Sequence, residues 1–290
     1  MRILISGSSG LVGGRLCELL APSHDVAGLV RHGAAPTGVP ELRADLTIDG
    51  EARRVLSERR PDFLIHCGAL ADSEACERDP ERARRDNVVT ARNVARAARQ
   101  SGTRLLFFST DLVFPGDQPW SSEKTEPAPI SVYGRTKLEG ERATLDESPD
   151  AVIFRISLVC GRGIGGRRTA SEALASRLRN GEPATLYEDE WRTPTDPESI
   201  ARAVEAVIAR SEVRGIFHIA GPERVNRVEF GRRVATLLGL DPRLIKGARR
   251  AQHQGAPRPS DVSLDIGRAK RELAWEPRSL NEAVLESRID

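Results

Sequence analysis

The sequence predicts an α/β fold built on a doubly wound parallel sheet, with a smaller lobe formed by its C-terminal part. The first sign is a short apolar strand at 2–6 that runs directly into a glycine-rich turn and a helix. Strand-like and helix-like stretches then alternate with short connections, which is typical of a parallel sheet covered by helices on both faces. The length of 290 residues exceeds one simple domain and leaves room for the additional lobe.

The elements of the first part follow from their hydrophobic patterns. The expected strands are 2–6, 26–30, 63–66, 104–108 and 151–159, and the expected helices are about 11–20, 51–60, 80–99 and 132–145. The stretch 115–131 is rich in proline and is expected to be a loop.

Beyond residue 160 the alternation becomes less regular. The expected helices lie near 169–179, 197–209 and 227–238, and the expected short strands lie at 184–187 and 216–219. This pattern predicts a first domain over 1–160 and a second lobe made mainly of 161–290, with the chain crossing between the two.

The composition argues against several classes of protein. The 44 basic and 42 acidic residues nearly balance, so no field strong enough to attract nucleic acid or an acidic membrane is expected. No apolar stretch approaches the roughly 18 residues of a membrane span, and the apolar start of the chain is too short for a signal peptide. The four cysteines form no C-x-x-C pair and stand beside no histidine cluster, which predicts reduced thiols, a cytoplasmic location and no metal site.

A phosphate-binding turn is predicted directly after the first strand. Residues 7–13 read G-x-x-G-x-x-G and open a helix. Glycine lets the backbone approach a pyrophosphate closely, and the helix N-terminus offers free N–H groups to that anion. We therefore expect a Rossmann-type dinucleotide-binding domain whose turn contacts the cofactor through Gly7, Ser9, Gly10, Leu11 and Val12. A second glycine-rich run at 161–166 fits a similar pattern, but a mobile loop near the substrate is the better interpretation.

The residues after the second strand favour NADP(H) over NAD(H). Domains that bind NAD place an acidic residue here to hold the ribose hydroxyls. In this chain Arg31 and His32 follow instead, and a guanidinium suits a 2′-phosphate that an acid would repel. Asp45 and Leu46 lie near the expected end of a further strand, between those at 26–30 and 63–66, and would lie near the adenine. A surface position without any role in binding is the alternative for Arg31.

A catalytic pair is predicted on the helix that follows the proline-rich loop. Tyr133 and Lys137 are four residues apart and therefore share one helix face. A nearby ammonium stabilises a phenolate and lowers the pKa of the tyrosine, so the pair can exchange a proton with a substrate oxygen. Ser109 and Thr110 directly follow a strand, where a hydroxyl can bind the same oxygen. The chain has only two tyrosines and four lysines, so a chance pair at this spacing is rare.

Together these motifs resemble the extended short-chain dehydrogenase/reductase superfamily, and within it the dTDP-4-dehydrorhamnose reductases and related sugar-nucleotide reductases. The resemblance covers nearly the whole chain. It rests on the glycine-rich turn, S-T-D-L-V-F at 109–114, the block 126–141 with Y-G-R-T-K, the strand at 154–161, R-T-P-T at 192–195 and R-P at 258–259.

The resemblance implies an NADP(H)-dependent oxidoreductase that binds a nucleotide-sugar in its C-terminal lobe. NADPH would deliver hydride to the C4 ketone of a nucleotide-linked 6-deoxy sugar, and Tyr133 would protonate the new alkoxide. A homodimer is also implied. The implied catalytic residues are Thr110, Tyr133 and Lys137; the implied further cofactor contacts are Gly68, Ala69, Leu70, Ser109, Tyr133 and Lys137; the implied substrate contacts are Thr110, Val159, Arg192, Pro194 and Arg258.

Two alternatives stay open. A nucleotide-sugar epimerase or dehydratase resembles the same superfamily, but such enzymes usually prefer NAD(H), and Arg31 argues against them. The absence of a further acid–base pair after Thr110 argues against them as well. A non-catalytic NADP-binding regulator, similar to the methionine adenosyltransferase regulatory subunit, is the other alternative, since a fold does not determine a function. The complete set of Thr110, Tyr133 and Lys137 favours an enzyme.

Overall fold

The computed structural model describes residues 1–287, in which strands and helices alternate. The strands are β1 Arg2–Ser6, β2 Asp25–Val30, β3 Glu41–Arg43, β4 Phe63–His66, β5 Arg104–Thr110, β6 Val152–Ile156, β7 Ala184–Tyr187, β8 Trp191–Arg192, β9 Gly215–Ile219, β10 Val225–Asn226 and β11 Ile245–Ala248. The α-helices are α1 Leu11–Leu20, α2 Glu51–Arg59, α3 Ser73–Arg78, α4 Pro80–Arg84, α5 Thr90–Ser101, α6 Val132–Glu147, α7 Ala170–Arg179, α8 Pro197–Ile208, α9 Arg227–Leu237, α10 Gly267–Leu273 and α11 Leu280–Glu286. A π-helical turn η1 covers Arg85–Val89, and 3-10 turns η2, η3 and η4 cover Asp111–Val113, Pro242–Leu244 and Arg250–Gln252.

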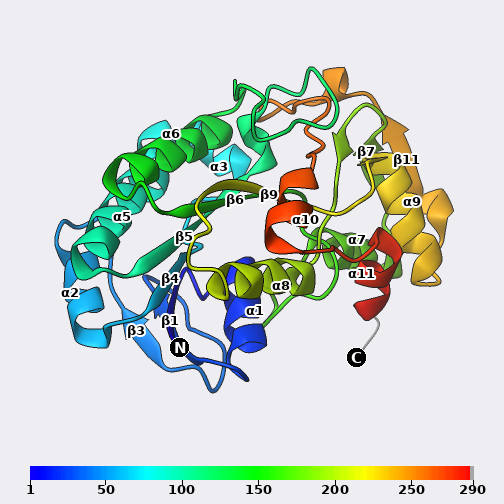
Figure 1. Cartoon of the computed structure of the whole chain (residues 1–290). Helices are drawn as coiled ribbons and strands as arrows, with labels where there is room; N and C mark the ends of the chain where they lie inside the picture. The colour runs from blue at the N-terminus through cyan, green and yellow to red at the C-terminus, as the bar shows by residue number, and fades with distance from the viewer. Residues whose placement is uncertain (288–290) are drawn as a thin grey trace.

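Within residues 1–287 a seven-stranded sheet forms the centre of the molecule, in the order β3-β2-β1-β4-β5-β6-β9 (Figure 1). All neighbouring strands in it run parallel. The strand β1 is a continuous apolar run because both of its faces are buried: Ile3 and Ile5 pack into one core and Leu4 into another. The predicted doubly wound α/β class is therefore confirmed.

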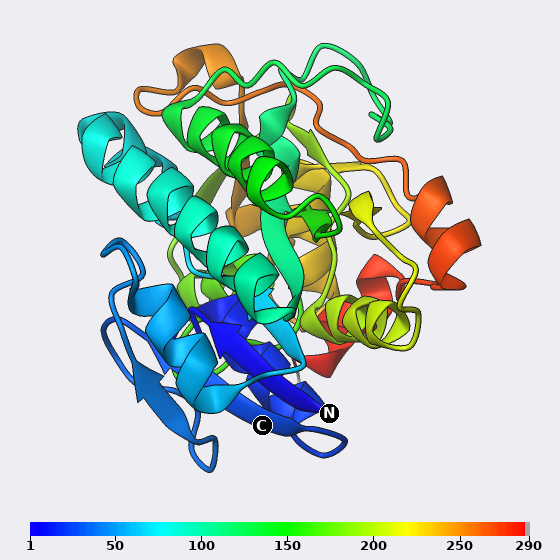
Figure 2. The ribbon, with the colours of Figure 1, turned by 60° about the vertical axis from the view of Figure 1, so that its left-hand side comes forward.

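Helices cover both faces of this sheet. On one face α2 packs against α5, and α5 packs against α6, as Figure 2 also shows for the last two. Val55 of α2 and Val94 of α5 share the core that contains Leu4. On the other face α1 packs against α8, with Leu16 and Ile200 in the core that contains Ile3 and Ile5.

A smaller group of elements lies beside the sheet, at the right of Figure 1. It includes α7, α9, α11 and the parallel pair β7 and β11. These elements have a hydrophobic core of their own, in which Leu174, Phe230, Val234 and Val284 are buried. The antiparallel pair of β8 and β10 belongs to the same later part of the chain.

Several expected elements differ from the structure. The single helix predicted over 80–99 is wrong, because the π-helical turn η1 separates α4 from α5. The strand predicted to reach residue 159 ends at Ile156 in β6. The strand at 216–219 and the helix at 197–209 come from the later part of the chain, yet β9 pairs with β6 and α8 packs on α1. The chain therefore returns to the main sheet after residue 160, and the division into 1–160 and 161–290 stays a prediction.

The strand order places two loops together at one edge of the sheet. The strands β1 and β4 are neighbours, while the chain winds from β1 to β2 and β3 on one side and from β4 to β5 and β6 on the other. Ligands of open parallel sheets bind at the carboxyl ends of strands at such a reversal. Here the loop after β1 meets the loop after β4 so closely that a Cβ on Gly7 would lie 2.6 Å from the backbone nitrogen of Gly68.

Candidate active site

The glycine-rich turn between β1 and α1 is shaped for close backbone contact. Gly7 has a φ of +74°, which is a left-handed conformation that favours glycine. A Cβ on Gly13 would lie 2.5 Å from the carbonyl oxygen of Gly7, so the helix packs directly on the turn. Gly10 caps α1 without any side-chain hydrogen bond, and the first turn of the helix contains no acidic residue. The backbone N–H groups at this terminus can therefore receive a phosphate.

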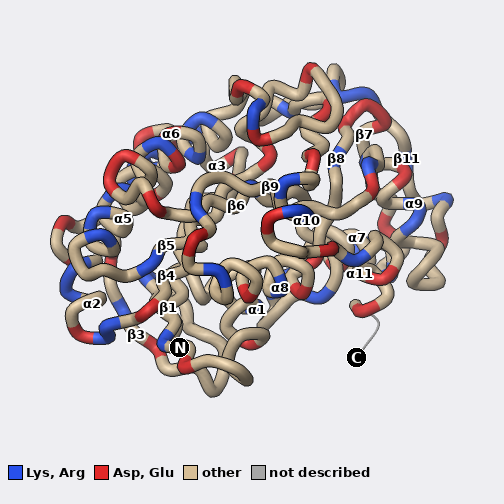
Figure 3. Tube along the Cα trace, in the orientation of Figure 1, with Lys and Arg blue, Asp and Glu red and all other residues tan. Residues whose placement is uncertain are grey.

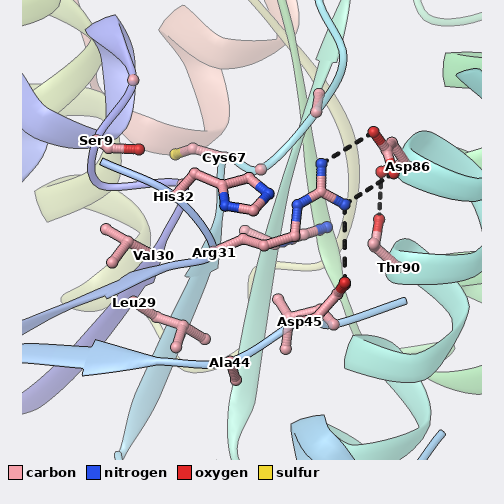
Figure 4. Close-up of a pocket in the computed structure, with 16 residues that line it drawn as sticks. Ser9, Leu29, Val30, Arg31, His32, Ala44, Asp45, Cys67, Asp86 and Thr90 are labelled. Carbon is pink, nitrogen blue, oxygen red and sulfur yellow. Dashed lines mark hydrogen bonds and ion pairs between the residues drawn. The ribbon is translucent and has the colours of Figure 1, made fainter. Parts of the chain in front are cut away.

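A pocket of about 230 Å³ opens beside this turn (Figure 4). Nine of the predicted cofactor contacts line it: Gly7, Ser9, Gly10, Arg31, His32, Asp45, Leu46, Gly68 and Ala69. The other predicted contacts, Leu11, Val12, Leu70, Ser109, Tyr133 and Lys137, are not among its lining residues. The turn, the end of β2 and the loop after β4 thus form one concave surface that fits the adenosine and pyrophosphate of a dinucleotide.

The guanidinium of Arg31 lies at the pocket and is paired there with an acidic side chain. It makes two hydrogen bonds to Asp86, Nη1 to Oδ1 at 2.9 Å and Nη2 to Oδ2 at 3.0 Å, which Figure 4 shows as dashed lines. Asp45 lies on the other side, with its Oδ1 at 3.8 Å from Nη1. The hydrogen bonds that Arg31 donates to Asp86 and the charges of both acids raise the pKa of Arg31. The expected arginine is in place, but two carboxylates accompany it.

Tyr133 and Lys137 lie in the first turns of α6, on the predicted helix face. Ser131 caps this helix by accepting a hydrogen bond from the backbone N–H of Gly134. Tyr133 packs against the small core formed by Cys76, Ala83 and Val132, and Lys137 is buried with only 3% of its surface exposed. The Nζ of Lys137 donates to the carbonyl oxygen of Phe108 at 2.6 Å.

Thr110, at the end of β5, completes the group: its hydroxyl interacts with the phenol of Tyr133 and donates to Oδ1 of Asp111 at 3.2 Å. Burial raises the pKa of Tyr133, and the charge of Asp111 raises it further, whereas the hydrogen bond with Thr110 lowers it. Burial also lowers the pKa of Lys137 to about 8. The expectation that Lys137 lowers the pKa of Tyr133 is therefore wrong for this structure, since the ammonium is bonded to the backbone of β5 instead.

The side chain of Ser109 belongs to a buried hydrogen-bond network between α6 and the sheet. Its hydroxyl donates to Glu141 of α6, and the same carboxylate forms an ion pair with Arg155 of β6 at 2.7 Å. This network joins α6 to two neighbouring strands. The predicted contact of Ser109 with a cofactor stays a prediction.

A cluster of charged side chains lies beside Thr110 and Tyr133. We call it the arginine cluster; it consists of Arg192, Arg227 and Arg258 with the acids Asp111 and Glu190. Nη1 of Arg192 is 3.0 Å from both carboxylate oxygens of Asp111, and Nη1 of Arg258 is 2.9 Å from Glu190. Burial lowers the pKa of Arg227 to about 10. Within residues 1–287, one nitrogen of each of the three arginines lacks a hydrogen-bond partner. Three cations against two anions, with unmatched donors, can receive a further anion.

Comparison with known proteins identifies the family. The family model described as the RmlD substrate binding domain matches residues 1–288. This chain belongs to that RmlD family. A probable low-salt glycan biosynthesis reductase of Haloferax volcanii is 31% identical, over 99% of this chain and 98% of its own length. The methionine adenosyltransferase 2 subunit beta of Danio rerio is 30% identical, over 92% and 83%.

A solved structure agrees with this assignment. The dTDP-4-dehydrorhamnose reductase of Bacillus anthracis, in complex with NADP, matches with a TM-score of 0.86 and 25% identity over 99% of this chain and 97% of its own. The predicted resemblance to the extended short-chain dehydrogenase/reductase superfamily is thereby confirmed.

Four of the predicted substrate contacts of this RmlD-family chain lie in or beside the segment 192–195. Arg192 belongs to β8. Pro194 follows β8, and its carbonyl oxygen lies where a side chain on residue 221, which is Gly221, would otherwise be. Val159 forms an isolated bridge with Thr195 of the same segment. Arg258 reaches the segment through Glu190. Their contact with a sugar-nucleotide stays a prediction.

Sequence reasoning missed several residues of both sites. Asp86 and Thr90 line the pocket, and Thr90 donates to the backbone oxygen of Asp86 at 2.6 Å. No periodic pattern could place Asp86, because the π-helical turn shifts the helix phase at this residue. His66 and Cys67 also line the pocket, and their position directly before Gly68 was an available signal. Arg227 in the arginine cluster carried no motif.

Two kinds of feature are absent from the described part of the chain. Among residues 1–287, no three His, Cys, Asp or Glu side chains are grouped so that they could hold a metal ion. No helix in the same range has the length and apolar character needed to cross a membrane.

Proposed function

We propose that this chain is an NADP(H)-dependent reductase of a nucleotide-linked 4-keto-6-deoxy sugar. The observation that carries the proposal is the contact of Thr110 with Tyr133, next to a buried Lys137, at the carboxyl edge of the sheet where the dinucleotide pocket lies. The relatives named as reductases and the NADP-bound structure support it.

The residues of the pocket fit NADP(H), since the open N-terminus of α1 would hold the pyrophosphate and Arg31 the 2′-phosphate. When bound there, NADPH supplies the hydride. The hydroxyl of Thr110 and the phenol of Tyr133 would hold the ketone oxygen of the substrate and polarise it. Tyr133 would then give its phenolic proton to the alkoxide. Its raised pKa means that the phenol is protonated at neutral pH, as this role requires.

The arginine cluster supports an anionic substrate. Its surplus positive charge and unmatched donors suit the diphosphate of a sugar-nucleotide. Asp111 belongs both to this cluster and to the surroundings of Tyr133, so the anion site and the proton donor are in direct electrostatic contact.

Steady-state oxidation of NADPH in the presence of a dTDP-linked 4-keto-6-deoxy sugar tests the proposal. Tyr133→Phe removes the proton donor and should lower kcat by about 100-fold or more. Tyr187→Phe is a matched control, because it is the other tyrosine of the chain and its hydroxyl contacts only His253 among the hydrogen bonds found. NADPH binding without turnover, on this and related keto-sugars, would contradict the proposal.

A second candidate is a non-catalytic NADP-binding regulator. It is favoured by the 30% identity to the methionine adenosyltransferase 2 subunit beta of Danio rerio over 92% of this chain. The two candidates differ in one readout, because a regulator would bind NADPH and leave it unoxidised in the assay above.

A further inference from the structure

The acid that holds Arg31 is buried at the wall of the dinucleotide pocket. Only 5% of the Asp86 side chain is exposed, and both of its carboxylate oxygens accept hydrogen bonds from the Arg31 guanidinium. Figure 4 shows Arg31 extending from the end of β2 across the pocket to the helical segment that carries Asp86. The ion pair therefore bridges two opposite walls of the pocket.

The π-helical turn η1 explains why an acid lies at this point. The side chain of the next residue, Asn87, accepts a hydrogen bond from the backbone N–H of Leu70 and donates one to the carbonyl oxygen of Leu70. It also donates to the hydroxyl of Thr136 of α6 at 2.9 Å. These contacts fix η1 against the loop after β4 and against the catalytic helix. With Asn87 held there, Asp86 lines the pocket beside Thr90.

Among the charged groups that line the pocket, Arg31 is accompanied by two carboxylates, those of Asp86 and Asp45. Asp86 is paired with Arg31, and Asp45 adds a second negative charge at 3.8 Å. Arg82 and Arg85 approach Asp86 at 3.6 and 3.7 Å, and about half of each side chain is exposed. A phosphate that approached Arg31 would therefore meet two carboxylates as well as the guanidinium, and its attraction would be reduced.

We propose that Asp86 sets how strongly this chain prefers a dinucleotide with a 2′-phosphate over one without it. It does so by occupying the guanidinium edge of Arg31 that the phosphate would otherwise bind. The inference rests on the proposed function, because it takes the pocket as the NADP(H) site. Asp86 is a specificity residue in this sense, and it weakens the preference that Arg31 alone would give.

The test uses two small probes that differ only in the phosphate at issue, adenosine 2′,5′-bisphosphate and adenosine 5′-monophosphate. Their binding is measured by titration calorimetry on the full chain at low salt, with NADPH and NADH as second probes. In Asp86→Asn the shared carboxylate charge is lost while the shape is kept. The bisphosphate should then bind about tenfold more tightly, and the monophosphate should change by less than about threefold.

Three controls make the result specific. Glu81→Gln removes one negative charge from the exposed face of α4, outside the pocket lining, and should leave the ratio of the two affinities unchanged. Arg31→Ala should abolish the effect of Asp86→Asn in the double variant, because the effect acts through Arg31. Asp86→Ser serves as a second variant, and thermal melting checks that each protein is folded.

The outcomes separate the two proposals. An affinity ratio that is unchanged or falls in both folded Asp86 variants overturns the inference, since Asp86 would then only anchor Arg31 in place. A wild-type chain that binds neither probe nor either dinucleotide overturns the proposed function together with the inference. Wild-type binding of NADPH without any turnover overturns the reductase and leaves the role of Asp86 supported or contradicted by the ratio alone.

Discussion

Lys137 is the member of the proposed catalytic group whose charge is destabilised by burial. Its ammonium is buried, and its contacts are the carbonyl of Phe108 and the ring of Phe107 at 4.2 Å. Neither partner carries a full negative charge, so burial dominates and lowers the pKa of Lys137 to about 8. An arginine at this position would stay charged at any accessible pH, whereas a lysine can respond to its surroundings.

Replacing Lys137 should trade activity for stability. In Lys137→Met the buried charge is gone, so the free energy of unfolding at pH 7 should rise by about 2 kcal/mol while turnover is lost. The folded pKa of about 8 lies below the ordinary value of 10.5, so the unfolded chain holds more protons between these values. The stabilisation that Lys137→Met gives relative to wild type should therefore shrink from pH 8 to pH 10, because the wild-type lysine loses its buried charge over this range. Urea unfolding at both pH values measures this.

A Lys137→Met protein that is less stable than wild type at pH 7 would contradict this reasoning.

Tyr133 affects the pH dependence of stability in the opposite direction at higher pH. Its raised pKa keeps the phenol protonated in the folded state above pH 10, where an ordinary tyrosine ionises, and stability then falls again.

Residue identities were easier to predict than their electrostatic surroundings. The spacing of Tyr133 and Lys137 on a helix could be predicted because helical geometry is local. The partners of Arg31 and the direction of the pKa shift of Tyr133 could not. Arg31 depends on Asp86, and the pKa of Tyr133 depends on burial and then on the charge of Asp111, all of which arise only through tertiary contacts.

At the scale of elements, the turn between β1 and α1 depends on two adjacent glycines with different surroundings. A Cβ on Gly13 would meet the backbone of Gly7 at 2.5 Å, and backbone cannot move aside cheaply. A Cβ on Gly14 would lie 3.1 Å from the side chain of Ile164 and from the carbonyl oxygen of Ser8. The loop at 161–166 thus packs on helix α1.

The two glycines form a matched pair of variants. Gly13→Ala should displace the turn, lower the free energy of unfolding by about 2 kcal/mol and weaken NADPH binding by about tenfold or more. Gly14→Ala should cost less than about 1 kcal/mol, because its Cβ needs shifts of only a few tenths of an ångström at Ile164 and at the Ser8 carbonyl, which the better helix propensity of alanine offsets. Thermal melts and NADPH fluorescence titrations compare them. Equal losses in both variants would show that the turn does not have this geometry.

The π-helical turn shows why some elements escaped prediction. The strands β1, β4 and β5 could be predicted from the sequence, because buried parallel strands need continuous apolar residues. The extra residue in η1 has no such pattern. It is accompanied by the bonds of Asn87 to Leu70 and Thr136, which join segments far apart in the sequence.

At the scale of the whole molecule, the order of the first six strands follows from general rules, but the later part does not. The seventh strand, β9, comes from beyond residue 160 and reaches the sheet through pairing with β6. Arg104 supports this return, since its guanidinium donates to the carbonyl oxygens of Val207, Arg210 and Val213. Such long-range contacts have no signal in a single sequence.

Charge is distributed without a dominant sign over the molecule. Figure 3 shows basic and acidic positions interspersed along the elements, in keeping with the net charge of +2. The positive charges that matter to the proposed function are instead the few buried ones of the arginine cluster. Local burial, more than overall charge, gives an anion-binding site its strength.

The transfer of label from the dinucleotide to the sugar tests the proposed reaction most directly. NADPH that carries deuterium at C4 of the nicotinamide is incubated with the wild-type chain and the dTDP-linked 4-keto-6-deoxy sugar, and the product is analysed by mass spectrometry. A reductase places one deuterium on the C4 carbon of the sugar for each NADPH consumed, with label from one face of the nicotinamide only. A product that lacks deuterium with both of the NADPH preparations labelled on a single face, or bound NADPH that is never consumed, would contradict the reductase.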